Sequence, residues 1–434
     1  MISHLALENF KSLKKADLDL RELNILVGPN NTGKSSVLHA LAFLAQNAKE
    51  KSLLLNGKFA NLGNLREISF KGEEDIGISF TIKFDEEEIK KIKEIFEGTP
   101  FSKFDFSGIT SYFDIPTNKC IREGHTKVAP SQLVNTELWE ERELSRVFGY
   151  FEGKKDIDLD LQDEITDISG GIMPRVRGGK SGILETYREF EKIIERKFDE
   201  NFFYLKAPRG IEEREKNISN KPPKSVGLHG EFLADVLAYI RDDPKYEISK
   251  EKIRNWGSKF GFKNIIPKLI ESPSYAINLT DERLGVQSNI VDIGFGTNQI
   301  LSVIVQCFCA PKGSFIMVEE PEIHLHPRNQ AELADLFVDV VDYGHQLIIE
   351  THSMHILLRL QRRIAEGKIS PDDIAIYSFY FDEQEKSNKT ERIELDEVGR
   401  FKKKIPGFFE DELEDIWEHS RAVMERSKRK EKNE

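Results

Sequence analysis

One octapeptide limits the folds open to this chain more than any other feature. Residues 28–35, GPNNTGKS, match the pattern GxxxxGK[ST] at every defined position. The apolar run Leu23–Val27 stands directly before them, and residues 35–45 after them have the pattern of a helix. A glycine loop between a buried strand and a helix N-terminus is the context in which this pattern binds phosphates. The sequence therefore predicts an α/β fold built around a phosphate-binding loop.

Each residue type in this loop has a chemical reason to be there. Backbone N–H groups of the loop and of the first helical turn can point at a phosphate. Lys34 would add a positive charge near the β- and γ-phosphates, and the Ser35 hydroxyl is a hard oxygen donor of the kind that Mg²⁺ prefers. We therefore expect ATP and Mg²⁺ as cofactors. The predicted nucleotide-binding residues are Gly28, Asn30, Asn31, Thr32, Gly33, Lys34, Ser35 and Ser36.

Carboxylates follow a second apolar run, in the stretch FIMVEEPEIHLHP at residues 315–327. A P-loop ATPase needs a second acidic site that holds Mg²⁺ and orients water. Glu319 is predicted to face the metal, and Glu320 is predicted to be the general base for the attacking water. A charged loop after a buried strand would explain the stretch equally well if the phosphate-binding loop were absent. His324 and His326 suggest zinc at first sight, but no third ligand is evident nearby.

Composition narrows the class of protein. The chain has 434 residues, a net charge of -12, 39% hydrophobic and 32% charged residues. It shows no apolar run of membrane-spanning length and no signal-peptide pattern, and its three cysteines give no disulfide framework. We expect a cytoplasmic protein without a membrane partner. The acidic balance counts against a surface that coats nucleic acid uniformly, although local basic clusters occur.

Four short motifs together resemble a known family. NFKSL, GPNNTGKSS, EEPEIHLHP and ETHS are similar to motifs of the ATPases related to the SMC, RecF and OLD proteins, which have ABC-type heads. The resemblance covers roughly residues 1–85 and 225–400. It implies an α/β head with a mixed or parallel sheet, split into residues 1–85 and 226–400. Residues 86–225 would then be a largely helical insertion, and residues 401–434 a C-terminal tail.

The resemblance also implies roles for further residues. His352 matches the switch histidine that senses the γ-phosphate. Residues 292–299, DIGFGTNQ, resemble a degenerate signature motif, which would present Gly296 and Asn298 to the γ-phosphate on another subunit. Gln46 matches either the metal-contacting glutamine of such heads or a surface residue.

Such heads are half-sites, so the resemblance implies a homodimer that sandwiches two ATP molecules. OLD proteins carry a TOPRIM nuclease after the head, and the residues after His352 show no acidic nuclease constellation. We therefore expect an ATP-switched sensor that acts with a separately encoded effector, such as a nuclease, in anti-phage defence. The alternative is a RecF-type repair ATPase that binds DNA directly. A transporter ATPase is disfavoured because no well-formed LSGGQ is present, and a small-molecule kinase is disfavoured by Glu320 and His352.

Overall fold

The computed structural model describes most of the chain outside the central region. The described residues are 1–48, 54–72, 76–84, 86–95, 106–114, 119–126, 192–193, 195–217, 223–271, 274–403 and 421.

An 11-stranded sheet runs through the described residues and carries the candidate site. Its spatial order is β6-β5-β4-β1-β2-β15-β14-β3-β13-β12-β7. The strands are β1 (Ile2–Phe10), β2 (Leu13–Asp19), β3 (Leu23–Val27), β4 (Gly77–Lys83), β5 (Phe106–Asp114), β6 (Lys119–Thr126), β7 (Phe202–Leu205), β12 (Phe315–Glu319), β13 (Gln346–Glu350), β14 (Ile374–Asp382) and β15 (Ser387–Ile393).

The half of this sheet from β14 to β7 is parallel, and the half from β6 to β2 is antiparallel. The parallel strands β3 and β13 are buried at every position, and β12 at all but its last. This burial explains their continuous apolar sequences, because helices cover both faces of a parallel sheet. The carboxyl ends of β3, β13 and β12 therefore meet at one edge.

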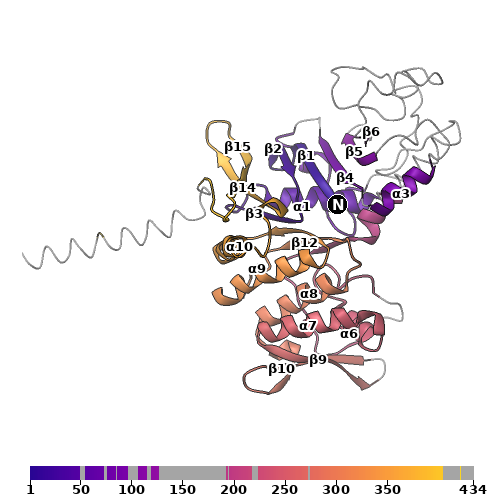
Figure 1. Cartoon of the computed structure of the whole chain (residues 1–434), viewed down its shortest axis with the longest axis vertical. Coiled ribbons are helices and arrows are strands. Elements are labelled where there is room, and N and C mark those ends of the chain that lie inside the picture. Colours follow the sequence, from indigo (N-terminus) through magenta and orange to yellow (C-terminus); the bar gives the residue numbers. More distant parts are fainter. Residues whose placement is uncertain are drawn as a thin grey trace, which may run out of the picture.

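Helices cover the two faces of the parallel half (Figure 1). On one face α1 (Lys34–Asn47) packs in a core with the side chains of Leu26, Met317 and Ile348. On the other face lie α8 (Phe295–Cys309), α9 (Pro327–Asp342) and α10 (Met354–Ala365), in a second core with Ile25 and Val318. Alternate residues of one strand thus belong to opposite cores, as the period of two requires.

A smaller unit continues the second core, at the bottom of Figure 1. It contains α6 (Leu233–Arg241), α7 (Glu247–Lys259) and a four-stranded sheet of β8 (Lys216–Asn217), β9 (Phe262–Glu271), β10 (Ser274–Asp281) and β11 (Gln287–Asn289). The Trp256 indole N–H donates to Asp339 at 2.7 Å, which joins α7 to α9. The remaining elements are α2 (Leu65–Ile68), α3 (Glu86–Ile95) and the single turns Arg196–Glu200, Pro244–Tyr246, Ile290–Asp292 and Pro371–Asp373.

The α/β class with a mixed sheet is confirmed, and the main sheet also includes strands from residues 86–225. β7 lies within residues 86–225 and pairs with β12 in the main sheet. β5 and β6 extend the same sheet at its other end. The described part of residues 86–225 contains both helical turns and strands, and β5, β6 and β7 belong to the main sheet. Most of the expected tail, residues 401–434, lies outside the described residues.

No helix in the described ranges is both long enough and apolar enough to cross a bilayer.

Candidate active site

Two glycines allow the loop between β3 and α1 to pack tightly against its neighbours. Gly28 has φ 140°, and a Cβ there would lie 2.2 Å from the Phe379 carbonyl oxygen of β14. Gly33 has φ 105°, and a Cβ there would lie 2.6 Å from a methyl carbon of Leu13. Both positions combine a positive φ with a close approach, so only glycine fits without strain. The loop is thereby held against β14 and β2.

Lys34 is buried at the first position of α1. Its ammonium group donates to the carbonyl oxygens of Gly28 at 2.9 Å and Pro29 at 2.8 Å. Burial lowers the pKa of Lys34, while the nearby Glu350 carboxylate acts in the opposite direction. The ammonium thus lies on the loop's own carbonyls, and the charged oxygens of a phosphate would be stronger acceptors for it.

The other predicted loop residues divide into exposed and buried groups. Asn30, Asn31 and Ser35 are exposed, so they can meet a ligand. Thr32 is buried and its hydroxyl donates to the Pro29 carbonyl at 2.8 Å. Ser36 is buried too, and its hydroxyl lies 2.9 Å from that of Ser12. The hydroxyls of Thr32 and Ser36 therefore hold the loop in shape.

Glu319 ends β12 and turns toward the loop after β7. Its carboxylate accepts hydrogen bonds from the Tyr204 hydroxyl and, at 3.1 Å, from the Ala207 backbone N–H. Burial, with the charge of Glu319 as a second cause, raises the pKa of Tyr204 well above its usual value. No hydrogen bond of Glu319 to Ser35 is present among the described residues. The side chain predicted to face the metal is thus held by the β7 loop.

Glu350, to which the sequence analysis gave no role, contacts the predicted metal ligand Ser35. It ends β13, and its carboxylate accepts the Ser35 hydroxyl at 3.0 Å. The Lys34 nitrogen lies 4.0 Å from the same oxygen. Burial raises the pKa of Glu350 to about 7, against the opposing effect of Lys34. The available signal was an acid at the end of an apolar strand, directly before Thr351.

Glu320 and His352 lie close to each other and to Glu350. The Glu320 carboxylate is 3.9 Å from the His352 Nε2, and each side chain is about one-third exposed. Burial lowers the pKa of His352, and the charge of Lys34 lowers it further. Both effects favour the neutral imidazole. Glu320 has φ 38°, an uncommon backbone conformation for a residue other than glycine.

A buried arginine supports the strained turn at Glu320. Arg209 is 2% exposed, and its guanidinium donates to the carbonyl oxygens of Glu319 and Glu320. Burial lowers the pKa of Arg209 to about 10, although neighbouring carboxylates oppose this shift. We infer that Arg209 positions the end of β12. It lies in a region without motifs, so the sequence offered no signal for this role.

The two signature-like residues, Gly296 and Asn298, are buried and contact neighbouring segments of the same chain. Asn298 is buried at 3% exposure, and its carboxamide exchanges two hydrogen bonds with the backbone of Ile211, at 2.8 and 2.7 Å. A Cβ on Gly296 would lie 2.5 Å from the His324 carbonyl oxygen. Both residues were expected to face a nucleotide on another subunit. In this structure the Asn298 side chain instead joins α8 to the β7 loop, and Gly296 lets α8 approach the turn after β12.

Gln46 lies buried near the far end of α1, away from the phosphate-binding loop. It lies 12 residues after Lys34 on α1, which places it roughly 18 Å along the helix from the phosphate-binding loop. It is 8% exposed, and its carboxamide donates to the Leu54 carbonyl and accepts from the Ala60 N–H. Its role is to fasten the loop that follows α1.

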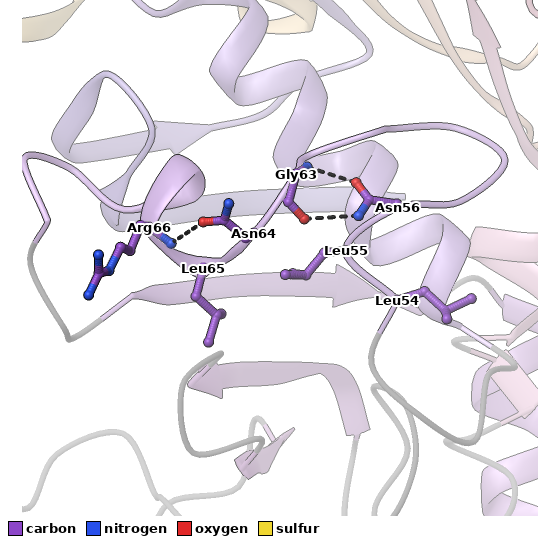
Figure 2. Close-up of a pocket in the computed structure, with 7 residues that line it drawn as sticks. All are labelled: Leu54, Leu55, Asn56, Gly63, Asn64, Leu65 and Arg66. Atoms are coloured by element: carbon purple, nitrogen blue, oxygen red, sulfur yellow. Dashed lines mark hydrogen bonds between the residues drawn. The ribbon is translucent and has the colours of Figure 1, made fainter.

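A pocket of about 760 Å³ is formed by that loop, and Figure 2 shows its lining. Asn56 and Gly63 exchange two hydrogen bonds across it, at 2.9 and 2.7 Å. The lining residues are Leu54, Leu55, Asn56, Gly63, Asn64, Leu65 and Arg66. The pocket adjoins the end of α1 opposite to Lys34, so it is not the place where the phosphate-binding loop would hold a nucleotide.

The two histidines that suggested zinc do not converge. His324 packs edge-on against Phe295, with ring centroids 5.1 Å apart. His326 is the N-cap of α9, where its ring accepts from the Arg328 N–H at 3.3 Å. In the described ranges, the group able to hold a metal is Glu320, Glu350 and His352, whose ligand atoms lie within 4.8 Å of one another.

The residues present fit a hard divalent cation such as Mg²⁺. Glu320, Glu350 and the hydroxyl of Ser35 supply oxygen donors at one strand edge. One buried oxygen of Glu350, Oε2, has no hydrogen-bond partner among the described residues. A buried carboxylate oxygen without a partner is costly, and a bound cation would relieve that cost.

Comparisons with known proteins identify the family of the chain. Residues 1–357 match the model of a family described as an AAA ATPase domain. An OLD nuclease from Thermus scotoductus is 22% identical over 362 residues, which cover 81% of this chain and 59% of that protein. The chain thus spans about three-fifths of the length of this relative.

Solved structures of SMC head domains are also similar to the chain. An SMC head bound to the C-terminal winged-helix domain of ScpA is 14% identical, with a TM-score of 0.48, and covers 91% of this chain and 98% of that one. The SMC head domain from Thermotoga maritima is 9% identical, with a TM-score of 0.42, and covers 91% and 99%. Because the family match spans most of the chain, the protein belongs to the AAA ATPase domain family and is an ATPase.

Proposed function

We propose that this ATPase is a nucleotide-switched regulatory subunit, in which ATP binding joins two copies and hydrolysis separates them. One observation carries the proposal. Lys34, Ser35, Glu320, Glu350 and His352 converge at the carboxyl edge of three neighbouring parallel strands. A phosphate-binding loop beside a candidate base and an imidazole is suited to phosphoryl transfer to water.

Hydrolysis would proceed through residues whose places are described above. Lys34 would leave the loop carbonyls and bind the phosphates, and exposed loop amides would hold the rest of the triphosphate. Water would attack the γ-phosphorus as its proton passes to Glu320, and the bond to the β-phosphate oxygen would break to release ADP. His352 would donate a hydrogen bond to the γ-phosphate. Mg²⁺ held near Ser35 would neutralise phosphate charge.

The second copy would contribute the start of α8. The first turn of this helix contains no acidic side chain, so its positive dipole end is free to meet an anion. Gly294 and Phe295 are exposed there, and His324 is exposed next to them. We propose that backbone N–H groups at this end, rather than the Asn298 side chain, would meet the γ-phosphate bound to the partner.

We further propose that the switch controls a separate effector, with a nuclease as the first candidate, in anti-phage defence or DNA maintenance. Support comes from the OLD nuclease relative and from the OLD-like motifs at Lys34, Glu320 and His352. The RecF-like alternative is direct DNA binding. The net charge of -12 counts against it.

The test uses Glu320→Gln in the full chain. Loss of the base should lower kcat by roughly 10²–10⁴-fold while ATP binding persists. Light scattering should then show a dimer with ATP and a monomer with ADP. A variant that turns over ATP at the wild-type rate would refute the base assignment, and a mass that ATP does not change would refute the switch. ATP-dependent, salt-sensitive binding to duplex DNA would favour the RecF-like alternative.

A further inference from the structure

Glu350 is a buried carboxylate to which none of the sequence motifs assigns a role. It is 4% exposed at the end of β13, where the strand meets the edge that carries the phosphate-binding loop. Its Oε1 accepts the Ser35 hydroxyl at 3.0 Å. Its Oε2 is buried and has no hydrogen-bond partner in the part of the chain that the structure describes. A carboxylate so placed retains the capacity to bind a cation.

The neighbouring carboxylate of Glu319 already has hydrogen-bond partners in and after β7. Glu319 and Glu350 are direct neighbours in the parallel ladder, so their side chains leave the sheet on the same face. The Glu319 carboxylate accepts from the Tyr204 hydroxyl and the Ala207 N–H. Of the two neighbouring acids, Glu350 is therefore the one that reaches Ser35.

The Ser35 hydroxyl can bind Glu350 and a cation at the same time. It gives its one hydrogen to Glu350, which leaves its oxygen lone pairs free for a cation. Glu320 and His352 place ligand atoms within 4.8 Å of those of Glu350. The buried ammonium of Lys34 lies 4.0 Å from Glu350, and it would turn to the phosphates when nucleotide binds. Glu350 would then need another cation beside it.

We propose that Glu350 is an anionic ligand of the divalent cation at this ATPase site, acting through Oε2 beside the Ser35 hydroxyl. Glu319 is a positioning residue that joins the end of β12 to the β7 loop. The inference rests on the proposed nucleotide site, and it assigns the cation to a different strand end from the one that the sequence suggested. Mg²⁺ and Mn²⁺ share the preference for octahedral oxygen ligands, so Mn²⁺ can report on the site.

The experiment measures Mn²⁺ binding by the full chain in the presence of ADP, from the electron paramagnetic resonance signal of free Mn²⁺. Glu350→Gln keeps an oxygen that can accept from Ser35 but removes the charge. We expect its Kd for Mn²⁺ to rise roughly 10- to 100-fold. Glu350→Asp keeps the charge on a shorter side chain and should lie between this variant and the wild type.

Two comparison variants and one further measurement exclude a merely structural role. Glu319→Gln should change the Kd for Mn²⁺ less than Glu350→Gln does. Glu391→Gln removes an equal charge from β15, where Glu391 pairs with Lys403, and should leave the Kd unchanged. In EDTA, Glu350→Gln should bind ADP at least as tightly as the wild type, because a negative charge near the phosphates is gone.

Three results would overturn the inference. The first is a wild-type Kd for Mn²⁺ in Glu350→Gln, and the second is a larger loss in Glu319→Gln. The third is a fall in metal-free ADP binding that matches the fall in Mn²⁺ binding, which would make Glu350 a structural residue. Failure of the proposed function is distinguishable, because the wild-type chain would then bind no ADP in either condition.

Discussion

The strand edge around Lys34 and the start of α8 both contain motif residues, but they use their polar groups differently. At the strand edge, buried charges remain incompletely paired: Lys34 lies on loop carbonyls, and one oxygen of Glu350 has no partner within the described ranges. At the start of α8, Asn298 has two internal hydrogen bonds and Gly296 is packed against the turn after β12. The polar groups at the strand edge can therefore accept a ligand, whereas those at the start of α8 hold neighbouring segments of the chain together.

The difference teaches that a motif position does not by itself identify a ligand-binding side chain. An unpaired buried charge has a free-energy cost that a ligand can remove, whereas a paired carboxamide has nothing to gain from one. Substitutions at the strand edge should therefore change nucleotide binding, and substitutions at the start of α8 should first change stability.

The largest expected effect is at Lys34. Lys34→Ala removes the cation that would bind the phosphates, so ATP affinity should fall by about 2–5 kcal/mol, or roughly 30- to several-thousand-fold in Kd. Isothermal titration calorimetry with ATP measures this change. Without nucleotide, the variant should unfold below the wild-type temperature, because the buried Glu350 carboxylate loses the cation beside it. Lys403→Ala, a surface control, should bind ATP normally, and ATP binding by Lys34→Ala at the wild-type Kd would break the comparison.

Asn298 tests the other side of the comparison. Asn298→Ala leaves the Ile211 N–H and carbonyl without partners in the interior, so the free energy of unfolding should fall by about 1–3 kcal/mol. Urea denaturation measures this loss, and the affinity of the folded protein for ATP should stay within about twofold of the wild type. An unchanged urea midpoint together with lost ATP hydrolysis would show that Asn298 acts on nucleotide after all.

Gly296 gives a closely matched pair with Gly294. Gly296→Ala places a methyl group 2.5 Å from the His324 carbonyl, so α8 and the turn must separate, at a cost of about 1–3 kcal/mol. At Gly294, the N-cap of α8, an added methyl group meets no atom within 4 Å, so Gly294→Ala lacks this clash and carries only the smaller cost of a poorer helix cap. Thermal unfolding of both variants separates the close approach from a general effect of alanine. Equal melting temperatures for the pair would mean that the contact with His324 is not needed for stability.

The sequence was sufficient for features encoded by contiguous residues. The phosphate-binding loop, its flanking strand and helix, and the positions of Glu320 and His352 at strand ends all follow from local patterns. The role of Glu350 depends instead on β13 lying between β3 and β12, a neighbour relation that no local pattern encodes. The Ser35–Glu350 bond joins residues 315 positions apart. The contacts of Arg209 with Glu319 and of Asn298 with Ile211 could not be read from the sequence for the same reason, since these partners are distant in the chain.

The smallest expected effect is the contribution of His39 to the pH dependence of the unfolding free energy. Burial lowers the pKa of His39, on α1, to about 4, and its Nδ1 lies 3.2 Å from the Lys11 ammonium. Unfolded His39 would bind a proton near pH 6.5, whereas folded His39 stays neutral until about pH 4. The unfolded state therefore binds more protons in this window, and stability is lost as the pH falls from 6.5 to 4. His39→Gln keeps an acceptor for Lys11 and cannot ionise, so its unfolding free energy should fall by about 1–2 kcal/mol less across the window. Urea denaturation at pH 7, 6, 5 and 4.5 measures this, and parallel pH profiles would show that α1 carries no such proton-linked cost.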